Sequence, residues 1–205
     1  SGGDTTSIKG QFLSISITAM GLVPRGAAVR RGGAKEGDVL LVTGAIGDAV
    51  LGLKAIRAAA ADDYAGAVSR YQLPQPRMDV HDIVQKYAHA AADVSDGLLA
   101  DSMNIAKASG LGLEIDPSKT PLSKDVQLAL DKNMISWQDI LCGGDDYELI
   151  LAVPESVVKQ CINEFNNKNI NLCVIGCFTS KALELHILDT VTYRIDDENL
   201  GWKHF

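Results

Sequence analysis

Apolar and polar residues follow one another along the chain in short blocks, which predicts alternating strands and helices. Val39–Thr43 is a continuous apolar run, so we expect a buried strand there. Leu98–Ala108 is expected to be a helix that Gly110 ends. Val80–Ala91 has apolar residues at helical spacing, whereas Tyr71–Met78 contains two prolines and is expected to be an extended connector.

The remaining segments extend the same pattern over the whole chain. Further strands are expected over residues 12–23, 111–115, 147–153, 172–178, 183–188 and 191–195. Further helices are expected from the Gly44–Asp48 turn to about residue 61, and over residues 122–130, 137–141 and 155–165. Strands and helices mixed in this way, with short loops, predict an α/β layered domain in which a mixed sheet packs against helices.

Composition and charge narrow the class of protein. The 205 residues are 46% hydrophobic and 22% charged, which is ordinary for a globular protein of one large or two small domains. The net charge of −7 argues against nucleic-acid binding, and the apolar runs are too short to cross a membrane. No signal peptide is visible, and the four cysteines lack the spacing of a zinc site, so we expect a cytoplasmic protein with reduced thiols.

Three clusters combine glycine with aspartate: residues 2–6, 93–97 and 143–147. A carboxylate beside glycine can be presented on a tight turn, where its oxygens reach a hard cation such as Mg²⁺. Glycine also leaves backbone N–H groups accessible to phosphate oxygens. Together the clusters predict a nucleotide–magnesium site.

Each cluster also has a structural interpretation. Gly3 and Asp4 are typical of an ordinary turn. Ser95 or Asp96 would be a suitable N-cap for the helix that follows. Capping accounts for one of these polar residues only, and the carboxylates of Asp93 and Asp96 repel unless a cation or proton separates them, so we favour metal binding, with Ser95 left to contact a phosphate.

A basic, glycine-bearing loop over residues 25–37 contains Arg31. Arg31 is either a solvated surface charge or a bidentate ligand for phosphate oxygens. Asp48 is expected to cap the helix that begins there, although a helix N-terminus also binds anions. The chain contains no Walker phosphate loop, no Rossmann dinucleotide turn and no nucleophile elbow.

Taken together, the motifs resemble those of the thiamine-monophosphate kinase family, which shares a superfamily with aminoimidazole ribonucleotide synthetase, selenophosphate synthetase and a hydrogenase-maturation protein. The resemblance covers essentially the whole chain. It rests on residues 2–6, 30–38 with 42–44, 93–101, 143–149 and 201–205. It implies the fold of the C-terminal domain of aminoimidazole ribonucleotide synthetase-like proteins. It further implies that residues 1–24 are a remnant of the N-terminal ATP-binding domain and that residues 25–205 are the C-terminal α/β domain.

The resemblance also implies roles for single residues. Three aspartates would bind Mg²⁺, three residues would contact ATP, and two would contact thiamine monophosphate. The Mg²⁺ ligands would be Asp4, Asp93 and Asp96. The ATP contacts would be Gly3, Arg31 and Ser95, and the thiamine monophosphate contacts would be Asp145 and Trp202. Trp202 would offer an aromatic face to a cationic ring of the substrate. The family usually has glutamate where Asp145 stands.

The implied reaction is ATP-dependent phosphorylation of thiamine monophosphate to thiamine diphosphate, by direct transfer and without a catalytic residue that becomes phosphorylated. The intact protein would be a homodimer. Because the family's front domain carries further Mg²⁺ ligands, we expect these residues alone to show little or no activity. The alternatives are another ATP-dependent enzyme of the superfamily, or an inactive truncated fragment that acts only as a folded module.

Overall fold

A computed structural model describes residues 17, 18, 20–188 and 201, and its regular elements lie between residues 38 and 187. The strands are β1 Asp38–Thr43, β2 Ala90–Asp93, β3 Gly112–Ile115, β4 Leu149–Pro154, β5 Leu172–Thr179 and β6 Leu185–Ile187. They form a six-stranded sheet in the order β2-β4-β1-β5-β3-β6. The β3–β6 pair is parallel and the other pairs are antiparallel, so the sheet is mixed.

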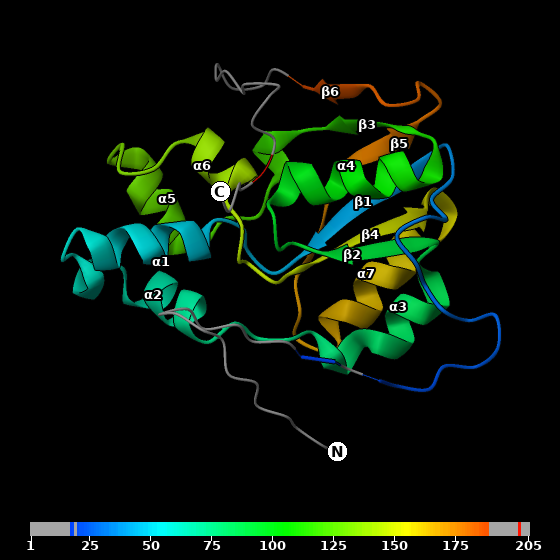
Figure 1. The fold of residues 1–205 in the computed structure, drawn as a ribbon, viewed down its shortest axis with the longest axis horizontal. Coiled ribbons are helices and arrows are strands. Elements are labelled where there is room, and N and C mark those ends of the chain that lie inside the picture. Colours follow the sequence, from blue (N-terminus) through cyan, green and yellow to red (C-terminus); the bar gives the residue numbers. More distant parts are fainter. Residues whose placement is uncertain (1–16, 19, 189–200, 202–205) are drawn as a thin grey trace, which may run out of the picture.

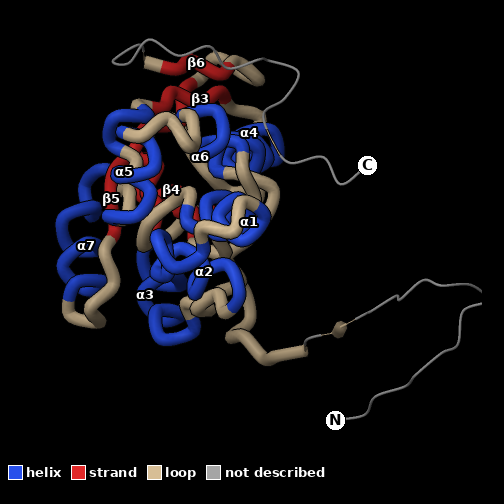
Figure 2. The backbone as a smooth tube through the Cα atoms, turned by 90° about the vertical axis from the view of Figure 1, so that its left-hand side faces the viewer, coloured by secondary structure: helices blue, strands red, loops and turns tan. Residues whose placement is uncertain are grey.

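Seven α-helices lie around this sheet in the described part of the chain (Figures 1 and 2). They are α1 Asp48–Arg57, α2 Ala65–Gln72, α3 His81–Tyr87, α4 Leu98–Ser109, α5 Lys124–Asp131, α6 Trp137–Cys142 and α7 Val158–Asn166. Short 3₁₀ helices cover Ala61–Tyr64, Met78–Val80, Pro117–Lys119 and Glu155–Val157. None of the described helices is long and apolar enough to cross a membrane.

Alternation along β1 explains the two layers of helices. Leu40 and Val42 point into a core shared with α1, α4, α5 and α6, whereas Leu41 points into a second core on the opposite face. That second core includes Phe165 of α7 and Ile83 of α3. Figure 1 shows α4 on one face of the sheet and α3 with α7 on the other, while α1, α2, α5 and α6 gather beyond one end of the strands.

The predicted α/β class is confirmed, and so are several of its elements. The strand expected at Val39–Thr43 is β1, and the helix expected at Leu98–Ala108 is α4. Gly110 follows α4 with φ of +71°, a left-handed conformation that glycine adopts without the strain a side chain would cause.

Some elements differ from the prediction, and other predictions fall on residues outside the described part. The helix expected over Val80–Ala91 ends at Tyr87, and Ala90 and Ala91 lie in β2, because residues 90–93 pair with β4. The helix α2 was not predicted. Of the strand expected over residues 12–23, the described residues are in no strand, and residues 191–195 lie outside the described part.

The pairing of β1, β2 and β4 gathers three chain segments at one edge of the sheet. Asp93, the last residue of β2, lies opposite Leu149, the first residue of β4. Val42, near the end of β1, lies opposite Ile150. The loops that follow β1 and β2 and the loop that precedes β4 therefore meet, and the candidate site is built from them.

Candidate functional site

The two glycine–aspartate motifs of the described chain form one structure, although about 50 residues separate them in the sequence. The backbone N–H of Asp145 donates to the carbonyl of Ser95 at 3.0 Å, and that of Tyr147 donates to the carbonyl of Val94 at 2.8 Å. A Cβ atom on Gly144 would lie 2.3 Å from the Ser95 carbonyl oxygen, so only glycine permits this approach. The motifs at residues 93–97 and 143–148 thus converge.

The turn at residues 95–97 is held by Asp101 rather than by a helix cap. The backbone N–H groups of Ser95 and Asp96 donate to Oδ2 of Asp101 at 3.0 and 2.9 Å. The N-cap of α4 is Gly97, and no side chain caps the helix. The interpretation of Ser95 or Asp96 as the N-cap is therefore wrong.

Arg31 lies beside Asp93. Its Nη2 is 4.0 Å from Oδ1 of Asp93, and both side chains are about half exposed. Arg30 pairs with Ala90 in an isolated bridge, and the N–H of Ala91 donates to the Arg30 carbonyl at 3.1 Å. The basic loop is thus fastened along β2, which directs Arg31 toward the carboxylates at the end of that strand.

Asp145 and Tyr147 have backbone φ angles of +69° and +51°, which side chains rarely adopt. The Tyr147 hydroxyl donates to Oδ1 of Asp145 at 3.0 Å. Desolvation raises the pKa of Tyr147, and so do the negative charges of Asp145, Asp93 and Asp96. The charges of three predicted site aspartates therefore raise the pKa of one hydroxyl group.

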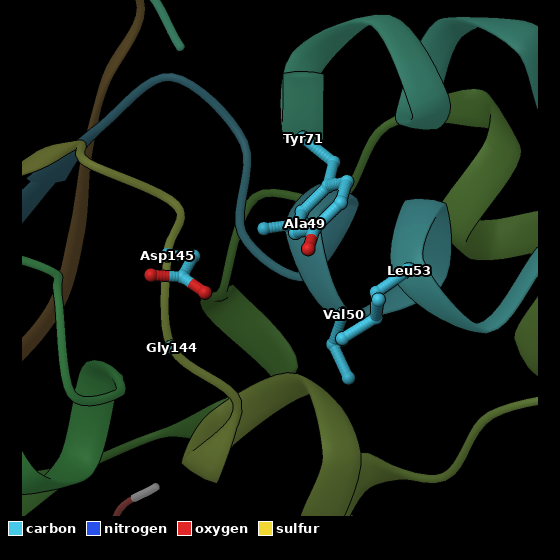
Figure 3. A pocket seen from close by; sticks show the side chains of 6 residues that line it. All are labelled: Ala49, Val50, Leu53, Tyr71, Gly144 and Asp145. Atoms are coloured by element: carbon cyan, nitrogen blue, oxygen red, sulfur yellow. The ribbon is translucent and has the colours of Figure 1, made fainter. Parts of the chain in front are cut away.

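Two hollows flank this loop. Asp93 and Tyr147 line a largely apolar cleft together with Leu149 and the connector between α2 and α3, which contributes Pro74, Pro76, Arg77 and Met78. Asp145 and Gly144 line a separate, smaller pocket (Figure 3). There its carboxylate faces Tyr71 of α2 and the side chains of Val50 and Leu53 of α1.

Part of the predicted Mg²⁺ site lies within the described residues. Among the described residues, no group of three or more His, Cys, Asp or Glu side chains is arranged to hold a metal ion. Of the three predicted Mg²⁺ ligands, the structure describes Asp93 and Asp96, whereas Asp4 lies outside the described part, as do Gly3 and Trp202. Carboxylate oxygens are the donors that Mg²⁺ prefers, so Asp93 and Asp96 fit this ion.

The end of the chain returns to the site at one described residue. A Cβ atom on Gly201 would lie 2.9 Å from the carbonyl oxygen of Asp96 and 2.6 Å from Cβ of Ala100. Gly201 therefore lies directly against the turn that carries Asp96.

Two acidic residues of the same loop, Asp146 and Glu148, were not singled out in the sequence. Along residues 145–148, the side chains at 146 and 148 are buried, and those at 145 and 147 are partly exposed. Positive φ angles at Asp145 and Tyr147 interrupt the extended backbone here, so burial in the structure, and no pattern in the sequence, distinguishes the inward acids from Asp145.

Asp146 caps α1 in place of the predicted Asp48. Its carboxylate accepts the N–H groups of Gly47 and Ala49 at 2.8 and 3.1 Å. Asp48 instead accepts the hydroxyl of Ser123 at 2.5 Å, so its predicted capping role is wrong. Burial raises the pKa of Asp146 to about 7, against the lowering effect of these two hydrogen bonds.

Glu148 is only 1% exposed and accepts several charged or polar donors. The Nη2 of Arg70 and the Nε of Arg77 each lie 2.7 Å from its carboxylate, and the Thr43 hydroxyl lies at 2.6 Å. The Nη2 of Arg77 makes a second contact. A buried carboxylate needs such partners, so Glu148 links β1, α2 and the connector to the site loop.

Comparisons with known proteins identify the family of this chain. The family described as AIR synthase related protein, C-terminal domain, matches residues 35–187. A thiamine-monophosphate kinase of Caulobacter vibrioides is 44% identical over 155 residues, which are 74% of this chain and 44% of that protein.

Two solved structures are similar in fold. The thiamine-monophosphate kinase of Stenotrophomonas maltophilia K279a has a TM-score of 0.75 and 31% identity, over 80% of this chain and 54% of that one. A structure named AaThiL complexed with AMPPCP and TMP has a TM-score of 0.71 and 30% identity, over 86% and 54%. The chain thus spans about half the length of these relatives. Since the family match covers most of its residues, the chain belongs to the family of AIR synthase related proteins, represented by their C-terminal domain.

Proposed function

We propose that the protein transfers the γ-phosphoryl group of ATP to thiamine monophosphate, giving ADP and thiamine diphosphate. The observation that carries the proposal is the convergence of Arg31, Asp93, Asp96 and Asp145 around two interlocked glycine-bearing loops. The similarity to thiamine-monophosphate kinases supports the choice of substrates.

The roles divide between the two loops. We assign Mg²⁺ binding to Asp93 and Asp96 with Asp4, and when bound the ion would offset the negative charge that gathers on the transferred phosphoryl group. We assign ATP contacts to Arg31, Ser95 and Gly3. The position of Arg31 supports this role. Its guanidinium lies beside Asp93, a proposed Mg²⁺ ligand, and would therefore be close to a phosphate bound at that ion.

Recognition of thiamine monophosphate is assigned to Asp145 and Trp202. Asp145 faces the pocket beside α1, and Tyr147 holds its carboxylate by a hydrogen bond. Gly201, the neighbour of Trp202 in the sequence, lies against the Asp96 turn. A tryptophan face would attract the cationic ring of the substrate.

The protein's own residues would act by binding and orientation. Both phosphorylated reactants are anions, so Arg31 reduces their repulsion, and the strained loop at Asp145 and Tyr147 fixes the acceptor. The acceptor phosphate is already a nucleophile, so no side chain needs to become phosphorylated.

Further parts of the proposal concern the intact protein. We infer that residues 1–24 belong to an N-terminal ATP-binding domain and residues 25–205 to the C-terminal domain, and that the protein is a cytoplasmic homodimer.

An ADP-release assay on the intact protein tests the proposed function. We expect release that needs both thiamine monophosphate and Mg²⁺, at about 1–100 s⁻¹. Asp93→Asn should lower the rate at limiting Mg²⁺ by roughly tenfold to a hundredfold, because one carboxylate ligand is lost. Asp82→Asn is the matched control, since Asp82 is 84% exposed on α3. Release that is independent of thiamine monophosphate would contradict the proposal.

A further inference from the structure

The cleft beside Asp93 has two walls of different origin. Tyr147 and Leu149, on either side of Glu148 in the sequence, form one wall with Asp93. The connector between α2 and α3 forms the other wall, with Pro74, Pro76, Arg77 and Met78. Glu148 does not line the cleft, but it lies between Tyr147 and Leu149 in the sequence, so its ion pair with Arg77 links the segment of the first wall to the second wall.

Within the described residues, the other side-chain hydrogen bonds of the connector are local ones, from Gln75 to the Leu73 carbonyl and between His81 and the Met78 carbonyl. Pro74 and Pro76 have no backbone N–H group to donate. The large side chains of Leu73 and Met78 are 69% and 71% exposed, so apolar burial does not fix this segment either. Arg77 is different, since its side chain is 19% exposed and its guanidinium makes two contacts with the Glu148 carboxylate. Such a bidentate contact fixes the orientation of the Arg77 side chain as well as its distance from Glu148.

We propose that Glu148 is a positioning residue for the substrate site, which acts through Arg77 to hold the connector at a set distance from Tyr147 and Asp93. Arg70 and Thr43 hold the same carboxylate from α2 and β1, so Glu148 itself has little freedom to move. The inference rests on the proposed function, because it assumes that this loop binds thiamine monophosphate.

The geometry specifies which kinetic constant should respond. Tyr147 is the residue of the cleft that hydrogen-bonds Asp145, the group assigned to the thiamine substrate. The connector faces Tyr147 across the cleft, so a displaced connector would no longer confine the tyrosine that holds Asp145, and the binding of thiamine monophosphate should weaken. Asp93 stays in place when the connector moves, because it pairs with Leu149 in the sheet, and Arg31 lies beside it. Phosphoryl transfer from bound substrate should therefore change less.

The kinetic test uses Glu148→Gln, Arg77→Gln and the double variant in the intact protein. Each single change should raise KM for thiamine monophosphate about tenfold and change kcat by less than about threefold. The double variant should be no worse than the worse single variant, because both remove the same contact. Glu164→Gln is the matched control: Glu164 also accepts a lysine and a tyrosine, at 2.6 Å each, but lies on α7. It should behave as wild type.

Trypsin cleavage after Arg77 gives a readout that does not depend on activity. In Glu148→Gln the freed connector should be cut at least about tenfold faster than in wild type, while cleavage after Lys86 stays unchanged. Cleavage that rises equally at both sites would indicate general unfolding, and would overturn a specific role for Glu148.

The remaining outcomes are also decisive. A wild-type KM in both single variants, with an unchanged cut after Arg77, would overturn the inference. So would additive losses in the double variant. If Glu148→Gln does not fold, Arg77→Lys replaces it: this variant keeps the charge but loses the bidentate contact, and should show an intermediate KM. A wild-type protein without thiamine-monophosphate kinase activity would refute the proposed function, and trypsin would still test the link between the walls.

Discussion

Asp146 makes the stability of the fold depend on pH in a specific direction. The side chain is 5% exposed and lies close to the negative charges of Asp48 and Glu148. Burial and these charges outweigh its two hydrogen bonds from α1, and raise its pKa from 3.8 to about 7. The folded protein therefore keeps a proton on Asp146 over a range in which the unfolded chain has lost it.

The direction and size of the pH effect on stability follow from this difference in pKa between the folded and unfolded states. Between about pH 4 and pH 7 the folded state binds more protons than the unfolded state, so the free energy of unfolding falls as pH rises. Above that range both states are ionised at Asp146, and below it both are protonated, so the contribution is constant at each end. A pKa difference of about three corresponds to at most about 4 kcal/mol.

Asp146→Asn isolates this contribution, because an amide does not titrate and its oxygen can still accept a hydrogen bond from α1. Urea unfolding of both proteins should be followed across the range from about pH 4 to pH 8. We expect the wild type to lose stability relative to the variant as pH rises. A difference between the two proteins that stays constant with pH, or that grows in favour of the wild type, would refute the reasoning.

Two further predictions concern glycine and tryptophan. Gly97→Ala should destabilise the fold by about 1–3 kcal/mol in urea unfolding, because φ there is +120° and a Cβ atom would lie 2.8 Å from the Cys142 carbonyl oxygen. Gly110→Ala, with φ of +71° and nothing within 4 Å of its Cβ, should cost less, and an equal loss would contradict the steric argument. Trp202→Ala should raise KM for thiamine monophosphate roughly several-fold to thirtyfold and leave KM for ATP unchanged. Equal increases for both substrates would make Trp202 a structural anchor.

The parts of the fold that were predicted correctly have patterns that do not depend on distant partners. β1 is a continuous apolar run, and Gly110 ends α4 for reasons of local backbone geometry. β2 was missed because its alanines favour a helix by propensity, while its pairing with β4 decides the outcome. Neighbouring strands thus override local preference where the local signal is weak.

The candidate site divides in the same way. Glycine beside aspartate is a local signal, and it located the loops that carry Asp93, Asp96 and Asp145. The roles of Asp146 and Glu148 depend on the N-terminus of α1 and on two arginines from α2 and the connector, which the sequence does not place beside them. Long-range partners of buried charges are therefore what the sequence did not reveal.

The fate of the γ-phosphoryl group tests the central claim most directly. The intact protein would be incubated with Mg²⁺, thiamine monophosphate and ATP labelled at the γ-phosphate, and the products would be separated and identified. We predict that the label appears in thiamine diphosphate, at its terminal phosphate, in amounts equal to the ADP formed. Label that remains in ATP, or that is released only as inorganic phosphate, would contradict the account.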